Sequence, residues 1–257
     1  MFYDILFKFY ELIFPKNFTI YNFLNSYIIN QPSNILDIAC GTGEYSIEFA
    51  QKGHKVFALD NNSNMIDKAR SKALLYSLLI TFDVIDMMSL NIYNLQFFDL
   101  IFVIGNSISH LNSIDEVKIF IKNVNSLLKD NAYFVVHSIN YDNPNILSPK
   151  FFPLIQRGNI EFIRYYSEQN NFLKLNFNTI INVYNENINL EDNFKLNKEI
   201  EQKEIKTYKN TIEHLVIHKE ELQRILEANF SEVKLYGDYN HNDYTKNSQS
   251  MIFVCKK

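Results

Sequence analysis

The segment 34–60, NILDIACGTGEYSIEFAQKGHKVFALD, constrains the fold of this chain more than any other part of the sequence. Its apolar residues 35–38 predict a buried strand that runs into the small residues 39–43. A helix is predicted after this turn, and Gly53 ends it. A second apolar strand follows over 56–59 and leads to Asp60. Strand, glycine turn, helix, strand and acid together make one βαβ unit, which favours a parallel sheet covered by helices on both faces.

The turn and the acid predict a ligand that contains adenosine. Gly41 and Gly43 let the backbone approach a ligand closely, and the start of the helix offers unpaired N–H groups. Asp60, at the end of the second strand, can accept hydrogen bonds from both hydroxyls of a ribose.

Two residues distinguish this βαβ unit from a typical dinucleotide-binding site. Ser46 stands where the dinucleotide pattern requires glycine or alanine. Asp37, late in the first strand, would repel a pyrophosphate but would favour a cationic amino-acid ligand. A nicotinamide-dependent oxidoreductase is therefore the less favoured interpretation.

The run Leu36-Asp37-Ile38-Ala39-Cys40-Gly41-Thr42-Gly43 closely resembles the first motif of the class I S-adenosylmethionine-dependent methyltransferases. That family usually has glycine at the place of Ala39. The resemblance implies S-adenosylmethionine as the cofactor and S-adenosylhomocysteine as its product. The residues that we expect to bind the cofactor are Tyr3, Tyr10, Asp37, Ala39, Gly41, Gly43, Asp60, Asn61, Met65, Asp86, Met87 and Gly105.

The adenine end of this predicted site depends on the third strand, 80–85. In the family, an acid that follows this strand accepts a hydrogen bond from the adenine amino group, and the next residue packs on the ring. Asp86 and Met87 hold these places, whereas Asp83 competes for the first role because sequence alone does not set the register of the strand. Met65, early in the helix after Asp60, is expected near the edge of the adenine.

The acceptor side is predicted from the loop after the fourth strand, 99–104. Ligands in parallel sheets bind just past the carboxyl ends of the strands. Residues 105–111 resemble the Gly-Asn-Ser-x-x-His-Leu element of glycine and sarcosine N-methyltransferases, and 140–142, after the predicted fifth strand 132–139, resemble a triplet of the same group. No catalytic triad is required, because methyl transfer from a sulfonium depends on alignment and exclusion of water.

The candidate acceptor residues are Asn106, His110, Tyr141, Arg157 and Tyr165. Arg157 could hold a substrate carboxylate, although exposed arginines are more often ordinary surface residues. For His110, a structural role weighs equally with a role in hydrogen bonding or proton transfer. His137 lies within a predicted strand and is expected to be structural.

The remaining segments complete a single predicted domain. Residues 1–30 form a cap of two helices broken at Pro15, 31–142 form the cofactor-binding core, 143–218 form an antiparallel β lid, and 219–257 return to the core as a helix and a hairpin. Strands in the lid are predicted over 160–166, 172–183 and 199–215, and the hairpin loop over 238–249. The predicted fold is a three-layer α/β sandwich with a seven-stranded, mostly parallel sheet, an antiparallel last strand and a β-rich lid.

Composition narrows the classes of partner. A net charge of -4 disfavours nucleic acid, which requires a basic face. No apolar run is long enough to span a membrane. Cys40 and Cys255 show no metal-ligand spacing, so a metal-free, cytoplasmic protein is expected, as a monomer or a homo-oligomer.

The sequence therefore predicts an S-adenosylmethionine-dependent methyltransferase that acts on a small molecule, and we favour an amine nitrogen as the methyl acceptor. The preference for nitrogen comes only from the resemblance at 105–111 and 140–142. A C- or O-methyltransferase of the same fold is the nearest alternative. A catalytically silent cofactor-binding module is a third interpretation. The predicted lid and the polar acceptor loop count against it, because a silent module has no need of a closed, polar acceptor site.

Overall fold

The computed structural model describes residues 3–169, 173–184 and 205–257, with side chains described from Leu6 onward. The chain divides into two compact units. The insert unit comprises Met1–Pro15 and Asn145–His214, and the core unit comprises Lys16–Pro144 and Leu215–Lys257. The segment 1–30, expected to form one cap, is therefore divided between the units after Pro15.

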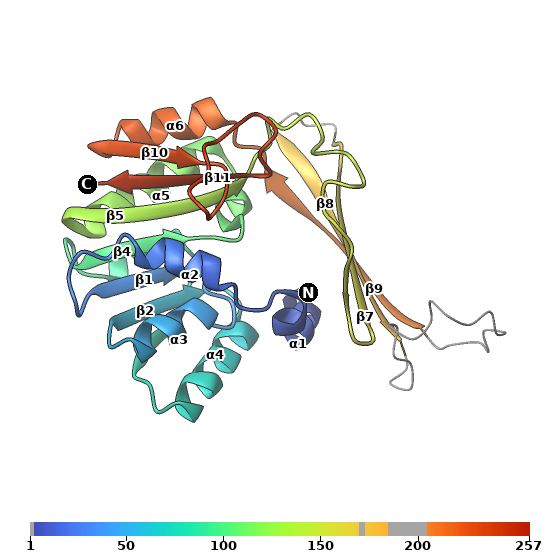
Figure 1. Ribbon diagram of the computed structural model, residues 1–257, viewed down its shortest axis with the longest axis horizontal. Helices are drawn as coiled ribbons and strands as arrows, with labels where there is room; N and C mark the ends of the chain where they lie inside the picture. Colours follow the sequence, from blue (N-terminus) through green and yellow to red (C-terminus); the bar gives the residue numbers. More distant parts are fainter. Residues whose placement is uncertain (1–2, 170–172, 185–204) are drawn as a thin grey trace. The chain divides into compact units, whose positions relative to one another are not determined.

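The core unit contains a seven-stranded sheet in the order β10-β11-β5-β4-β1-β2-β3 (Figure 1). Its strands are β1 (Asn34–Ile38), β2 (Lys55–Asp60), β3 (Ile80–Val84), β4 (Phe98–Val103), β5 (Leu128–Ile139), β10 (Glu232–Tyr236) and β11 (Ser250–Lys256). Strand β11 runs antiparallel to both of its neighbours, whereas β1 to β5 pair in parallel. This arrangement confirms the predicted fold class.

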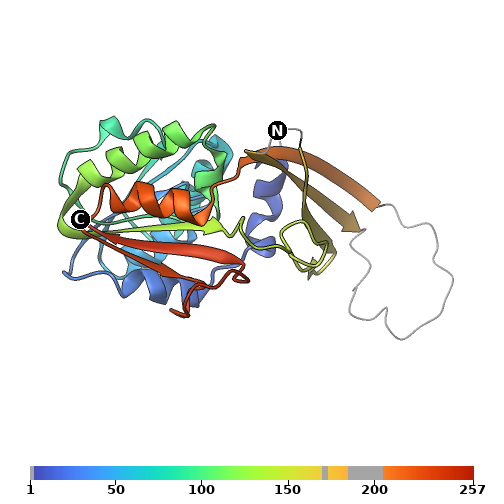
Figure 2. The same cartoon turned by 90° about the horizontal axis from the view of Figure 1, so that it is seen from above.

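Helices cover both faces of this sheet, as Figures 1 and 2 show. They are α2 (Phe18–Asn25), α3 (Glu44–Gln51), α4 (Ser63–Leu75), α5 (Ile114–Leu127) and α6 (Lys219–Glu227), with the short 3-10 helices η1 (Leu90–Ile92) and η2 (Ser107–His110). Side chains of α5 and α6 pack on one face, and those of α2, α3 and α4 pack on the other.

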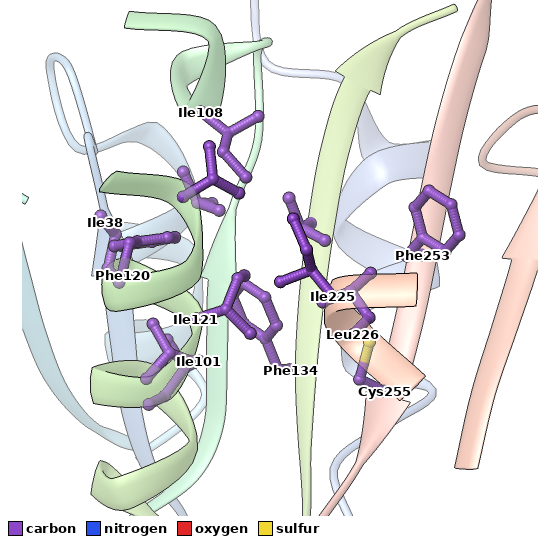
Figure 3. Packing of buried hydrophobic residues seen from close by; sticks show 14 of the residues in the cluster. Ile38, Ile101, Ile108, Phe120, Ile121, Phe134, Ile225, Leu226, Phe253 and Cys255 are labelled. Carbon is purple, nitrogen blue, oxygen red and sulfur yellow. The ribbon is translucent and has the colours of Figure 1, made fainter. Parts of the chain in front are cut away.

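The largest apolar cluster lies between the sheet and helices α5 and α6 (Figure 3). Phe120 and Ile121 from α5 meet Phe134 from β5, and Leu226 from α6 lies in the same cluster. Phe120, Ile121, Phe134 and Leu226 are fully buried. Because burying each such side chain contributes about 1.5 to 3 kcal/mol relative to its exposed state, this cluster gives the sheet a rigid base.

The ends of the helices follow local side-chain chemistry. The Asn62 side chain accepts a hydrogen bond from the backbone N–H of Met65 at 3.1 Å, so Asn62 caps α4. Ser113 caps α5 in the same way through the N–H of Glu116 at 3.2 Å.

Strand β5 differs from the sequence prediction, because it begins at Leu128 and not at Ala132. The residues expected to form a turn lie inside the strand, where the register shifts between Phe98 and Leu100 of β4. Asn131 takes the left-handed conformation with φ 64°. Asparagine tolerates this conformation better than most residues, so the turn chemistry is used for a bulge within the strand.

The insert unit contains a four-stranded sheet in the order β6-β7-β8-β9, together with helix α1. Their bounds are α1 (Tyr3–Ile13), β6 (Ile155–Arg157), β7 (Ile160–Ser167), β8 (Lys174–Tyr184) and β9 (Ile205–Leu215). Leu6 and Ile13 of α1 pack with Phe162 and Ile181 on one face of this sheet, which we call the covered face. Strand β6 was not predicted, and the predicted strand residues 172 and 199–204 lie outside the described residues.

Gly43, at the start of α3, provides a stability test. Its φ is +74°, and a Cβ there would lie 3.0 Å from the Cβ of Ala69 and 3.1 Å from the Phe82 ring. Left-handed strain and overpacking together predict that Gly43→Ala lowers the unfolding free energy by about 2 to 4 kcal/mol in chemical denaturation. Gly53 is a matched control, since its φ is +87° but a Cβ at this position would have no atom within 4 Å. Gly53→Ala should cost only about 1 kcal/mol, and equal losses would contradict the packing argument.

Candidate functional site

The candidate site lies where the order of the strands reverses. Strand β1 pairs in parallel with β2 on one side and with β4 on the other. The chain moves outward from β1 to β3 and then crosses back to β4 and β5. In sheets of this kind ligands bind outside the carboxyl ends of the strands at this reversal. The residues that follow β1, β2 and β4 therefore form the first set to consider.

The turn after β1 has an unusual backbone. Gly41 and Gly43 have positive φ angles of 55° and 74°, and Ala39 has a φ of 58°. A left-handed alanine costs about 1 to 2 kcal/mol, so this residue is strained at the place where the resembling family usually has glycine. The backbone thus bends sharply here and does so at a cost in stability.

Asp60 holds this turn in place. One carboxylate oxygen accepts a hydrogen bond from the N–H of Gly41 at 2.9 Å, and the other accepts one from the N–H of Asn62 at 2.9 Å. Burial raises the pKa of Asp60, while these two N–H groups act to lower it. Each carboxylate oxygen has a further lone pair. Asp60 can therefore hold the turn and still accept from a ribose.

Asp37 is a buried acid that is bonded to a neighbouring serine. Only 2% of Asp37 is exposed, and its carboxylate accepts a hydrogen bond from the Ser46 hydroxyl at 2.6 Å. Burial raises the pKa of Asp37 to about 7, although the Ser46 bond acts to lower it. The two residues that depart from the dinucleotide pattern, Ser46 and Asp37, are thus hydrogen-bonded to each other. The sequence alone did not reveal this pair, because nine positions separate the two residues along the chain.

The two acids near β3 occupy different surroundings. Asp83 lies within the strand and accepts a hydrogen bond from the Tyr93 hydroxyl at 2.8 Å. Asp86 lies two residues past the end of β3, is exposed, and accepts from the N–H of Met88 at 2.8 Å. Of these two acids, only Asp86 therefore presents an exposed carboxylate beyond the strand, and its contact with adenine stays a prediction.

Three other predicted cofactor residues differ in exposure. Met65 is 2% exposed in the first turn of α4, Met87 is half-buried, and Asn61 is exposed. Gly105 follows β4 with a φ of 71°.

Asn106 is buried at the centre of a hydrogen-bond network. Its side-chain oxygen accepts from the N–H of Ile139 at 2.9 Å and from the Ser109 hydroxyl at 3.0 Å. Its side-chain nitrogen donates to the Tyr141 hydroxyl at 3.0 Å. The amide thus ties the loop after β4 to the end of β5, and Asn106 is only 4% exposed. The predicted contact of Asn106 with an acceptor stays a prediction.

Tyr141 and His110 lie near this network in different environments. The Tyr141 hydroxyl donates to the Ser109 hydroxyl at 3.0 Å, and Tyr141 is 6% exposed. His110, the last residue of η2, keeps an exposed side chain, yet surrounding protein atoms remove enough water from its ring to lower its pKa. A lowered pKa keeps the imidazole neutral at pH 7 and able to accept a proton.

The other members of the triplet 140–142 have structural partners. The buried Asn140 side chain donates to the carbonyl oxygens of Lys246 at 3.1 Å and Ser248 at 2.9 Å. Asp142 accepts from the N–H of Lys219 at 2.8 Å, and its carboxylate lies 2.7 Å from the His218 ring nitrogen. The triplet therefore fixes the loop 237–249 and the start of α6, a role that sequence reasoning missed.

The insert unit carries the remaining predicted site residues. Arg157 is exposed at the end of β6 and donates to the carbonyl oxygen of Gln156 at 2.8 Å. Tyr165 is 39% exposed on β7, and Tyr10 packs its ring 5.3 Å from that of Phe14. The side chain of Tyr3 lies outside the described residues. The predicted contacts of these residues with cofactor or acceptor stay predictions.

Two classes of site are not found in the part of the chain that the structure describes. It contains no group of three or more His, Cys, Asp or Glu residues placed to hold a metal ion. None of its helices combines the length and apolar character needed to cross a membrane.

Residues 35–131 match a family model described as a methyltransferase domain. This match covers β1 to α5 and includes the turn, Asp60 and Asn106. This region of the chain is thus similar to methyltransferase domains. His137 lies just outside the match, in β5, where burial lowers its pKa to about 4.

Curated relatives with methyltransferase names also match part of this chain. The "Putative methyltransferase YqeM" of Bacillus subtilis (strain 168) is 34% identical over 110 residues, which is 42% of this chain and 44% of that protein. A glycine/sarcosine N-methyltransferase of Parasynechococcus marenigrum (strain WH8102) is 29% identical over 109 residues, 42% of this chain and 39% of that protein. The alignments thus span less than half the length of these relatives.

The fold of the whole chain also has a counterpart among solved structures. An S-adenosylmethionine-dependent methyltransferase from Clostridium acetobutylicum ATCC 824 superposes with a TM-score of 0.74 at 17% identity, over 99% of this chain and 98% of that one. At this identity the likeness concerns the fold alone. It extends beyond residues 35–131 to the described part of the insert unit.

The raised pKa of Asp37 predicts a pH dependence of stability. The pKa is about 7 in the folded chain against an ordinary value of 3.8. Between these values the folded state binds more protons than the unfolded state, so the unfolding free energy falls as pH rises from about 4 to about 7. Asp37→Asn should lack this fall and be more stable than the parent at pH 8 by up to about 4 kcal/mol. Chemical denaturation at pH 5 and pH 8 measures the effect, with the exposed Asp67→Asn as control. A parallel profile for parent and Asp37→Asn would contradict it.

The network around Asn106 predicts a loss of stability. Asn106→Ala leaves the Ile139 N–H and the Tyr141 hydroxyl without this partner, which should lower the unfolding free energy by about 2 to 3 kcal/mol. Ser107→Ala is the neighbouring control, because the Ser107 hydroxyl donates to one carbonyl oxygen, that of Ile104 at 2.9 Å. Its loss should be about 1 kcal/mol or less. Unchanged stability of Asn106→Ala would assign the amide to substrate contact instead.

Proposed function

We propose that this chain is an S-adenosylmethionine-dependent methyltransferase that transfers the methyl group to a nitrogen of a small-molecule amine. The observation that carries the proposal is the turn after β1, where Asp60 accepts from Gly41 beside the buried acid Asp37. This turn lies inside the region that matches the methyltransferase domain. The activity of the whole chain, its acceptor and its partners are parts of the proposal.

The residues of the turn fit the chemical groups of this cofactor. S-adenosylmethionine, when bound, supplies an electrophilic methyl group on a sulfonium. Asp37 and Asp60 place negative charge near the turn, which favours a cationic amino-acid group and disfavours a pyrophosphate. Asp60 has acceptor capacity for ribose hydroxyls, and Asp86 has an exposed carboxylate for the adenine amino group.

Nitrogen as the acceptor atom is supported by two observations. The aligned relative from Parasynechococcus marenigrum is named a glycine/sarcosine N-methyltransferase. His110 has a lowered pKa, so a neutral imidazole can accept the proton that keeps an amine from presenting its lone pair. Asn106 and Tyr141 support the loop that carries His110. A C- or O-methyltransferase remains the nearest alternative, and a silent cofactor-binding module would show binding without turnover.

The wider setting belongs to the same proposal. The described cysteines, Cys40 and Cys255, are free, which fits a reducing compartment such as the cytoplasm. A small-molecule acceptor fits the acidic net charge of -4 better than nucleic acid does.

Titration calorimetry with S-adenosylmethionine, S-adenosylhomocysteine and NAD in parallel tests the cofactor. Binding of the first two without NAD supports the proposal and justifies a screen of small amines for methyl acceptance. Binding of NAD alone, or of none of the three, would overturn it.

The two acids near β3 predict a sharp difference in affinity. Asp86→Asn should weaken S-adenosylhomocysteine binding by about 1 to 2 kcal/mol, because an amide replaces the carboxylate acceptor for the adenine amino group. Asp83→Asn is the matched control and should bind nearly as the parent does, since Asp83 is engaged by the Tyr93 hydroxyl. Calorimetry on both variants measures the difference, and the reverse order would transfer the adenine role to Asp83.

A further inference from the structure

A polar row crosses the covered face of the insert sheet, which is otherwise mostly apolar. Every second residue of β7 from Ile160 to Tyr166 lies on one face of the strand, and Arg164 is one of them. The other three, Ile160, Phe162 and Tyr166, are buried. Since successive side chains of a strand point to opposite faces, Arg164 lies on the covered face and Tyr165 on the other.

The strand register places Thr179 and Asn210 in the same row of the sheet as Arg164. Arg164 pairs with Thr179 of β8. On the opposite face, Thr207 bonds to Asn182 and Thr211 bonds to Asn178. From the first bond to the second, residue numbers rise along β9 and fall along β8, so the two strands are antiparallel. The same register places Thr179 opposite Asn210. The Thr179 hydroxyl donates to the Asn210 carbonyl oxygen at 3.4 Å, in agreement with this register.

Arg164 lies among aromatic rings and not beside an acid. Its guanidinium carbon is 5.8 Å from the ring centre of Phe14, 5.3 Å from that of Phe152 and 5.5 Å from that of Phe162. Its Nη2 donates to the Pro153 carbonyl oxygen at 3.3 Å. Among the described residues, none of the ion pairs includes Arg164. The side chain is half-buried, so its charge is partly removed from water without a compensating anion.

Two hydrogen-bond donors in this row have no acceptor within the described part of the chain. The Nε of Arg164 and the Nδ2 of Asn210 are both covered by protein and make no hydrogen bond to the residues that the structure describes. Buried donors without partners are uncommon in folded proteins, because each costs stability. Both groups donate, and Thr179 between them already uses its hydroxyl hydrogen. What the row lacks is an acceptor, and an anion supplies several.

We propose that Arg164, Thr179 and Asn210 form a binding site for the anionic group, a carboxylate or a phosphate, of a small molecule. The guanidinium offers paired donors that match carboxylate and phosphate oxygens, and the aromatic surroundings strengthen such charge-assisted bonds. The site lies on the covered face of the insert sheet. Its arginine is Arg164, whereas the sequence analysis named Arg157 as the residue that could hold a carboxylate.

Anion binding by the full chain tests the site directly. Calorimetric titrations with inorganic phosphate and with acetate, in separate experiments, distinguish the two anion classes. Arg164→Met should lower the affinity for the preferred anion at least tenfold, and Arg164→Lys by a smaller factor, because lysine lacks the paired donors. Arg224→Met removes the same charge from an exposed residue of α6 that pairs with Glu221, and it should bind as the parent does. Equal affinity of parent and Arg164→Met, or loss of binding in Arg157→Met instead, would overturn the proposal.

Asn210→Asp separates an anion site from simple packing. The new carboxylate would supply the missing anion inside the chain, so we expect a higher melting temperature together with loss of phosphate or acetate binding. If the row were only structural, the buried carboxylate would lower the melting temperature, and the proposal would fail.

Titration of Arg164→Met with S-adenosylhomocysteine should give the same affinity as the parent chain. A chain that binds S-adenosylhomocysteine but neither anion would overturn the anion site and leave the proposed function intact.

Discussion

The reversal of strand order between β1 and β4 determines which edge of the core sheet carries the candidate site. Because β1 pairs in parallel on both sides, the segments after β1, β2 and β4 all leave the sheet at one edge. Residues as distant in sequence as Asp60 and Gly105 thereby serve one region. The fully buried strands beneath them supply a rigid base on which strained loops can be held.

The core unit contains two destabilising features at this edge. Ala39 takes a left-handed conformation, and Asp37 is buried with a pKa raised to about 7. Neither feature helps the chain to fold, and both lie in the segment that is proposed to bind the cofactor. Strain and buried charge that persist at a site are typical of preorganisation for a ligand, since the surrounding structure must hold them in place. A cationic ligand beside Asp37 would relieve part of that cost.

The fold could be predicted from the sequence because its signals are local. Parallel strands are continuous apolar runs, and the caps Asn62 and Ser113 lie next to the helices that they begin. The functions of single polar residues could not be predicted in the same way, because their partners are distant. Asn106 bonds to a tyrosine 35 positions away, a contact that no local pattern indicates. Arg164 was missed because strand register, which decides the face of a side chain, is set by neighbouring strands and not by the strand itself.

The bonds of Asp142 have a consequence for how such a chain can diverge. Asp142 lies just before the chain leaves the core unit after Pro144, and it binds His218 and Lys219 just after the chain returns at Leu215. The two ends of the insert are thus held together by the core unit itself. A segment whose ends are fixed at one place can be lengthened, shortened or exchanged with little effect on the sheet that carries it. Evolution can therefore vary the insert while the sheet of the core unit stays unchanged.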